Sequence, residues 1–243
     1  MIDVTTLNII RLITGVVILS YASYTDIKTR KAANILWVIM GCIGGILLAI
    51  QYFFGTIENP LYLIFIPIMI GLIYGFYQFR LIFGGADAKA LMALSILVPI
   101  YPTILQFPIL TSSKMPAFIL PAPWIIFSNS VIIFLVIPLS LLLYNLIKRD
   151  VAFPHSFLGY TMSVEDAKQT FVWPLERIVD GKRKFVYMPK DFDTDKELEE
   201  FEKQDIKKIW VTPKIPFMIP LLLGFIITFL IGDILFSFMR LFI

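Results

Sequence analysis

Two aspartates beside apolar segments are the residues of this chain best suited to chemistry. Asp26 follows the first apolar segment within Ser-Tyr-Thr-Asp-Ile-Lys-Thr-Arg-Lys, and Asp87 lies between the third and fourth segments within Phe-Gly-Gly-Ala-Asp-Ala-Lys. Acidic side chains near bilayer depth are costly, so they usually have a function. Two carboxylates that share one proton can hydrolyse a peptide bond, because one accepts a proton from water while the other protonates the leaving nitrogen. This reaction needs neither a metal ion nor a covalent intermediate.

The residues around Asp87 suit a site that a substrate can approach. Gly84 and Gly85 have no side chains, so a substrate backbone can pass close to them and the chain can turn sharply into the next helix. Asp87 then falls in the first turn of that helix, where the helix dipole favours the ionised carboxylate. Lys89 is either a further contact to substrate or an interfacial lysine whose ammonium group reaches water.

Composition indicates a membrane protein and excludes several other classes. Of the 243 residues, 58% are hydrophobic and the mean hydropathy is +0.82, whereas soluble domains are about half apolar. A net charge of +3 gives no indication of nucleic-acid binding. The single cysteine, Cys42, excludes an internal disulfide and a cysteine-based zinc site. With His155 as the only histidine, we expect no metal site and no cofactor.

The apolar segments predict an all-α membrane protein with six transmembrane helices. Each segment approaches the roughly 20 residues that a helix needs to cross a bilayer. The proline-rich segment 107–123 is too broken for a straight helix, so we expect a re-entrant or interfacial loop there. Two other charges within the spans, Arg11 and Asp233, are expected to have structural or helix-end roles. The six predicted spans cover residues 5–25, 35–54, 61–80, 88–106, 124–147 and 215–240.

Residues 148–214 predict a small soluble α+β lobe between the fifth and sixth spans. They hold 13 of the 21 Lys and Arg residues and 13 of the 18 Asp and Glu residues. The segment 176–188 is typical of a β-hairpin with Asp180-Gly181 as its turn, and 209–211 of a further strand. A capping box at Thr194–Glu197 predicts a helix up to about residue 204. The expected domains are therefore 1–147 with the catalytic pair, the lobe 148–214, and 215–243 with the last span.

Basic residues predict the orientation of the spans. The loops after the first and third spans, and the lobe, carry most of the Lys and Arg, while the loop after the second span has none. Because positive charge accumulates on the cytoplasmic side, we expect the N-terminus outside and the lobe in the cytoplasm. Asp26 follows one crossing and Asp87 follows three, so both are expected at the cytoplasmic face.

Both aspartate motifs and one further segment of this chain resemble those of the type IV prepilin and preflagellin peptidases. Thr-Asp-Ile-Lys-Thr-Arg-Lys (25–31), with Asn34 eight residues after the aspartate, resembles their first aspartate motif. Phe-Gly-Gly-Ala-Asp-Ala-Lys (83–89) resembles their second motif, Gly-x-Gly-Asp, in its looser form with a hydrophobic residue before the aspartate. Ile-Trp-Val-Thr-Pro-Lys-Ile-Pro (209–216), which leads into the last span, resembles the archaeal preflagellin peptidases in particular.

The resemblance implies a membrane-embedded aspartyl peptidase that removes the short class III signal peptide of preflagellins, and of related prepilins, at the cytoplasmic face. Carried over by position, Asp26 and Asp87 form the catalytic pair, Gly84 is the first motif glycine, and Ala86 stands in place of the second. The bacterial members have a cysteine-rich cytoplasmic insert and methylate the new amino terminus. That insert has no counterpart here, so methyl transfer is not expected.

Two other functions are compatible with the same aspartates. A presenilin-like protease, which cuts within transmembrane helices, shares the second motif, but its first aspartate typically lies inside a span near a tyrosine. A proton-coupled transporter would use Asp26 and Asp87 as proton carriers and needs a polar path between the two faces. Apart from the aspartate pair, the spans contain little beyond Arg11 and Asp233 to form such a path.

Overall fold

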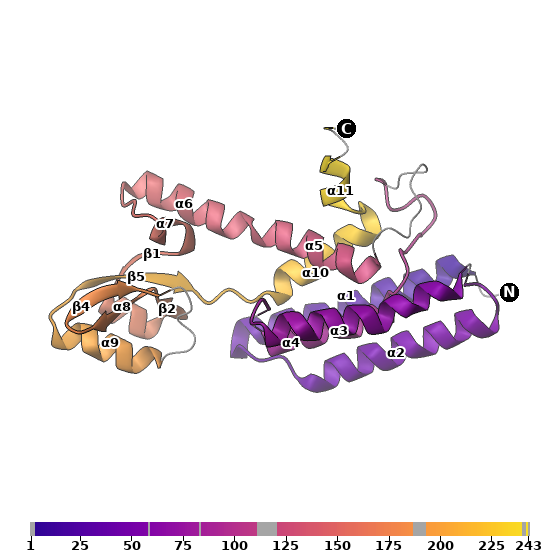
Figure 1. Cartoon of the computed structure of the whole chain (residues 1–243), viewed down its shortest axis with the longest axis horizontal. Helices are drawn as coiled ribbons and strands as arrows, with labels where there is room; N and C mark the ends of the chain where they lie inside the picture. The colour runs from indigo at the N-terminus through magenta and orange to yellow at the C-terminus, as the bar shows by residue number, and fades with distance from the viewer. Residues whose placement is uncertain are drawn as a thin grey trace. The chain divides into compact units, whose positions relative to one another are not determined.

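The computed structural model describes residues 3–57, 59–82, 84–110, 121–186, 193–239 and 242. The chain forms two compact units: residues 1–134 together with 216–243, and residues 135–215. The first unit is a helical bundle, and the second combines one long helix with a small lobe of helices and strands (Figure 1).

The helices of the first unit follow the apolar segments of the sequence. Four helical segments in the described part of the chain are long and apolar enough to cross a membrane: 4–29, 34–53, 60–78 and 122–148. They correspond to the first, second, third and fifth predicted spans. The elements of this unit are α1 (Val4–Thr29), α2 (Asn34–Phe53), the 3₁₀ helix η1 (Pro60–Ile64), α3 (Phe65–Gln78), α4 (Gly85–Leu97), α5 (Ala122–Phe134), α10 (Met218–Leu230) and α11 (Ile234–Met239).

The predicted fourth span, 88–106, contains a helix that ends earlier than expected. α4 stops at Leu97, and Val98 has a non-helical conformation with φ −131° and ψ 70°. Pro99 explains this end, because a proline disfavours the helical conformation of the residue before it. The prediction of six full-length spans is therefore not confirmed at this position.

The predicted sixth span, 215–240, is interrupted near its end. α10 ends at Leu230, and Gly232 has φ +114°, a conformation that L side chains rarely adopt. Asp233 then accepts a hydrogen bond from Phe236 N at 2.9 Å and caps α11, which confirms its expected helix-end role. The Asn129 side chain donates to Gly232 O at 2.8 Å and so supports the interruption from α5.

α4 is the most enclosed helix of the bundle. After Lys89 none of its residues is exposed, and it packs against α2, α3, α5 and α1. Small residues allow this close packing: a Cβ on Gly44 of α2 would lie only 2.6 Å from Leu97 Cα. A helix that is apolar on every side is stable only when neighbouring helices surround it, and this arrangement satisfies that requirement. The fully buried residues of α4 include Ala90, Leu91, Leu94, Ser95 and Leu97.

The second unit begins with α6 (Val136–Lys148), which is separated from α5 by a turn at Leu135. Pro138 explains the turn, because its nitrogen cannot donate to the carbonyl of Phe134, four residues earlier. The lobe follows as α7 (His155–Leu158), β1 (Tyr160–Ser163), α8 (Val164–Gln169), β2 (Val172–Pro174), β3 (Glu176–Val179), β4 (Lys182–Phe185), α9 (Thr194–Lys203) and β5 (Lys208–Pro213).

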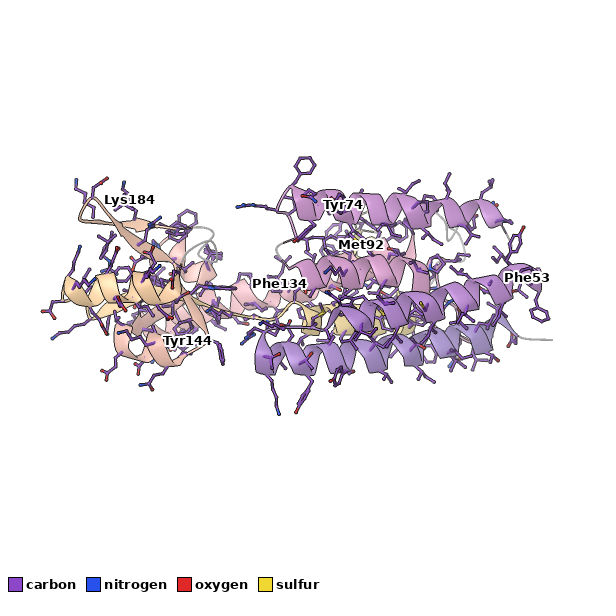
Figure 2. The ribbon with its side chains drawn as sticks, turned by 90° about the horizontal axis from the view of Figure 1, so that it is seen from below. Phe53, Tyr74, Met92, Phe134, Tyr144 and Lys184 are labelled. Atoms are coloured by element: carbon purple, nitrogen blue, oxygen red, sulfur yellow. The ribbon has the colours of Figure 1, made fainter. Side chains whose placement is uncertain are left out.

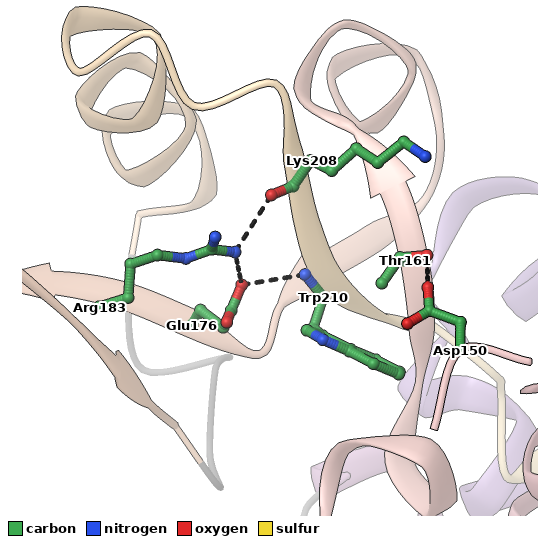
Figure 3. Close-up of polar contacts among 6 residues, drawn as sticks. All are labelled: Asp150, Thr161, Glu176, Arg183, Lys208 and Trp210. Atoms are coloured by element: carbon green, nitrogen blue, oxygen red, sulfur yellow. Dashed lines mark hydrogen bonds and ion pairs between the residues drawn. The ribbon is translucent and has the colours of Figure 1, made fainter. Parts of the chain in front are cut away.

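The strands of the lobe form two antiparallel sheets. One has the order β1-β5-β2, and the other is the β3–β4 hairpin, whose turn is the predicted Asp180-Gly181. The predicted strand at 209–211 is the centre of β5. Glu176 joins the two sheets, since its carboxylate accepts hydrogen bonds from Arg183 and from Trp210 N (Figure 3). The core between the sheets, α8 and α9 contains Val164, Ala167, Val172, Leu198, Phe201, Ile209 and Val211.

The predicted capping box of α9 is displaced by one residue. Asp193, rather than Thr194, is the N-cap, and its carboxylate accepts from Asp195 N at 3.3 Å. An aspartate forms this cap as readily as a threonine, so the helix begins at Thr194, one residue earlier than the motif indicated. The predicted interfacial loop 107–123 lies largely outside the described residues, which stop at 110 and resume at 121, and α5 already begins at Ala122.

Candidate active site

Asp26 and Asp87 lie at the same end of the first unit. Asp26 is in the last turn of α1, one short loop before α2, and Asp87 is in the first turn of α4. A hydrogen bond from Lys89 Nζ to Asn34 Oδ1, at 2.9 Å, joins the start of α4 to the start of α2. The loop between α1 and α2 and the loop between α3 and α4 therefore lie together (Figure 1). We call this the aspartate end.

The opposite end of the same helices carries the end of α2. Figure 2 shows Phe53 at that far end and Tyr74, near the end of α3, closer to the aspartate end. The arrangement follows from the alternating directions of consecutive helices joined by short loops.

Gly84 is the N-cap of α4, and its lack of a side chain creates the position of Asp87. A Cβ at Gly84 would overlap the carboxylate Oδ2 of Asp87 and lie 2.6 Å from its Cγ. The carboxylate therefore occupies the space that any side chain at position 84 would take. The approach of a substrate backbone at this glycine stays a prediction, and the geometry adds that the absence of a side chain at Gly84 leaves room for the Asp87 carboxylate.

Gly85 and Ala86 differ from Gly84 in what surrounds them. A Cβ at Gly85 would be 3.4 Å from the hydroxyl of Tyr77, which is ordinary van der Waals contact. Ala86 packs against the hydrophobic core of the bundle. Tyr77, at the end of α3, is a neighbour of the second motif that the sequence did not indicate, since its segment resembles any other aromatic-rich span.

The carboxylates at this end are only partly shielded. Asp26 and Asp87 are both half-buried, and Lys89 is exposed. One turn before Asp26, the hydroxyl of Ser23 is buried without a hydrogen-bond partner, and the indole nitrogen of Trp37 on α2 is in the same state. Buried polar atoms normally have hydrogen-bond partners, so the aspartate end contains two polar groups whose hydrogen-bonding capacity is not used among the described residues.

Arg11 lies in a second polar cluster, at the far end of the same helices. Its guanidinium donates to Asn8 Oδ1 at 2.9 Å and to Gln51 Oε1 at 2.6 Å, and Asn8 donates to Thr103 O at 2.9 Å. Arg11, Asn8 and Gln51 are each at most 5% exposed. The cluster joins α1, α2 and the chain after α4, which agrees with the structural role expected for Arg11. We call it the Arg11 end.

The ring of His155 packs against two aromatic rings of the lobe. Its ring contacts the rings of Phe185 at 4.5 Å and Trp210 at 5.3 Å between centroids. Burial in this aromatic setting is the main cause that lowers the pKa of His155. Among the described residues, no three His, Cys, Asp or Glu side chains are grouped so that they could hold a metal ion.

Comparison with known proteins identifies related peptidases. Residues 13–144 match the type IV leader peptidase family, and residues 152–234 match the archaeal peptidase A24 C-terminus, type II. Three similar proteins are named preflagellin peptidase. The one from Methanococcus voltae is 32% identical over 90% of this chain and 94% of its own length. The one from Methanocaldococcus jannaschii is 30% identical over 92% of this chain and 94% of its own length. The one from Methanococcus maripaludis is 29% identical over 95% of this chain and 98% of its own length.

The chain belongs to the type IV leader peptidase family. It is therefore a protease, and its apolar helices make it a membrane protein. The first match covers both aspartates, and the second covers most of the lobe and α10.

Proposed function

We propose that the protein is an aspartyl endopeptidase that removes the short leader from preflagellins, and from related prepilins, with Asp26 and Asp87 as its catalytic pair. The observation that carries the proposal is the position of both half-buried carboxylates at one end of the bundle, where the Lys89–Asn34 bond joins the start of α4 to the start of α2. The names of the three similar proteins support preflagellins as the substrates.

The reaction uses the two carboxylates and one shared proton. The ionised carboxylate takes a proton from water as the water oxygen attacks the scissile carbonyl carbon, and the protonated carboxyl gives its proton to the carbonyl oxygen. The resulting diol breaks its C–N bond: the nitrogen accepts a proton from one carboxyl, and the other carboxylate removes a proton from a diol hydroxyl. The pair thus returns to its starting state, and one water has been added across the bond.

The cytoplasmic face is the proposed location of the reaction. The aspartate end carries Lys28, Arg30 and Lys31 after α1, and Arg80 and Lys89 around the start of α4. Basic residues of this kind favour the cytoplasmic side, which places the N-terminus outside. A leader peptide attached to an apolar helix would reach this end from the cytoplasm while its helix lies among the spans.

The test is to replace each aspartate by asparagine and measure cleavage of a purified preflagellin. Asp26→Asn and Asp87→Asn should each lower the cleavage rate by about 10²–10⁴-fold or more, because an amide can neither accept nor supply the catalytic proton. Circular dichroism and thermal unfolding in detergent should be close to those of the unaltered protein.

Asp233→Asn is the matched control. It makes the same chemical change at the cap of α11, where asparagine is an equally good cap, so cleavage should stay within a factor of about two. Chelators and inhibitors of serine or cysteine proteases should leave cleavage unaffected. Full activity in either the Asp26 or the Asp87 variant would refute the assignment.

A further inference from the structure

Exposed apolar side chains surround the junction between α6 and α7. Ile147 is 74% exposed, Val151 54% and Phe153 85%, and Phe157 is also exposed. The rings of Phe153 and Phe157 are 6.3 Å apart between centroids, so the two aromatics form one surface. We call these four residues the α6–α7 surface. Large aromatic side chains in a soluble lobe normally avoid this degree of exposure unless something covers them.

Asn145 fixes the position of α7 relative to α6. Its side chain lies in the last turn of α6, is only 1% exposed, and donates to Ser156 O at 3.0 Å and to Gly159 O at 2.7 Å. The chain after α6 therefore folds back beside the last turn of that helix instead of extending away from it. Phe157, the residue after Ser156, is held at the level of this turn.

The level of this turn follows from where the span ends. The segment 122–148 is long and apolar enough to cross a membrane, and its last turn is the end of α6. The end of a membrane-spanning segment falls in the headgroup layer. Lys148 and Arg149, at the end of α6, are exposed and basic, as expected for residues at that depth.

The charges near the α6–α7 surface are compatible with lipid. The only acidic residue between 147 and 158 is Asp150, and Thr161 donates a hydrogen bond to its carboxylate at 2.6 Å (Figure 3). This bond turns the carboxylate toward β1 of the lobe. Lys148 and Arg149 supply positive charge that attracts lipid phosphates, at about 1 kcal/mol for each basic residue near an anionic surface.

We propose that the α6–α7 surface lies in the interfacial layer of the membrane that the segment 122–148 crosses, and that it anchors the lobe to that layer. The partner is the lipid of this bilayer, with the aromatic rings at the boundary between headgroups and acyl chains and the two basic residues at the phosphates. Aromatic and basic side chains commonly occupy this boundary. The inference does not depend on the catalytic role of either aspartate.

The test measures the environment of single cysteines in the full chain. Cys42→Ala removes the only native thiol, and Phe153→Cys, Phe157→Cys and Glu199→Cys then each provide one site for a fluorescent label. Glu199 is the matched control, because it is an exposed position on α9 of the same lobe. Each labelled protein is reconstituted into vesicles that contain anionic phospholipid, and its emission is measured with aqueous iodide or with lipids that carry a quencher near the headgroup.

The labels at positions 153 and 157 should be quenched by the lipid-borne group and protected from iodide by roughly threefold or more relative to position 199. Equal iodide quenching at all three positions would overturn the proposal, since the surface would then face water. Protection from both quenchers would also overturn it, because a protein would then cover the surface. Two labelled positions are used so that one poorly folded variant does not decide the result.

Discussion

The two ends of the helical bundle differ in how deeply their charged side chains are buried. At the Arg11 end, Arg11 is buried and donates to Asn8 and Gln51, so these residues hold α1 and α2 together, although the Nε of Arg11 has no hydrogen-bond partner among the described residues. At the aspartate end, the carboxylates are half-buried. Buried, partnered groups stabilise an arrangement of helices, whereas a group that must meet water and substrate has to remain accessible.

The difference between the two ends indicates how a structural charge can be distinguished from a catalytic charge in a membrane protein. A charge within a span is a candidate for function in either case. What distinguishes the two ends is the surroundings of each charge: two side-chain acceptors enclose Arg11, while the neighbour of Asp87 is a glycine that leaves room for its carboxylate. Substitutions at the two ends should therefore affect different measurable properties.

Among substitutions that keep both aspartates, the largest effect is expected from Gly84→Ala. The new methyl group would overlap the Asp87 carboxylate, so that side chain must move. A displacement of about 1 Å in a catalytic group can cost roughly 10²-fold in rate, and we expect a loss of this size in preflagellin cleavage.

Gly85→Ala is the control for this substitution. Its methyl group would meet only the Tyr77 hydroxyl, at 3.4 Å, so cleavage should remain within about threefold of the unaltered enzyme. Equal losses in the two variants would show that the backbone of the motif matters more than the space beside Asp87.

The next effect is expected at the Arg11 end and concerns stability. Gln51→Leu removes the acceptor of an Arg11 N–H and leaves that donor buried without a partner. We expect the free energy of unfolding to fall by about 1–3 kcal/mol, measured by denaturant titration in detergent, with the cleavage rate of the folded enzyme unchanged.

Gln51→Glu keeps an acceptor at the same place and is the matched variant for this comparison. It should lose less stability than Gln51→Leu, because a carboxylate can pair with the Arg11 guanidinium. A fall in cleavage rate without a fall in stability in Gln51→Leu would mean that the two ends do not have separate roles.

The smallest effect is expected from the exposed bond between α2 and α4. Lys89→Met removes the donor to Asn34, and a double-mutant cycle with Asn34→Ala should give a coupling of about 0.2–1 kcal/mol in stability. Cleavage should fall several-fold, because this bond joins the start of α2 to the helix that carries Asp87. A coupling near zero together with full cleavage would remove Lys89 from the site.

Local sequence signals predicted several elements correctly. The Asp180-Gly181 turn, the strand at 209–211 and the cap at Asp233 each depend on residues close in sequence, and the structure confirms all three. The four long spans follow from apolar length alone. The presence of both aspartates at one end could also be predicted, because it follows from counting helices.

Other features depend on contacts between distant segments, and the sequence did not indicate them. Arg11 on α1 and its partner Gln51 on α2 are 40 residues apart, and a lone Gln51 in an apolar run gives no hint of the pairing. The bonds of Asn145 to the α7 segment likewise depend on how the chain folds back. Pro99 and Gly232 could have suggested early helix ends, but the continuous apolar runs around them favoured full spans.

The enclosure of α4 has a consequence for how the enzyme depends on its membrane. Beyond Lys89 none of the residues of α4 is exposed, and only Met92 and Ile96 are half-buried, so lipid chains have little access to the helix that carries Asp87. The surroundings of this helix are mainly other helices of the same protein. A change in lipid headgroups, chain length or fluidity therefore affects Asp87 mainly by moving the helices that surround α4.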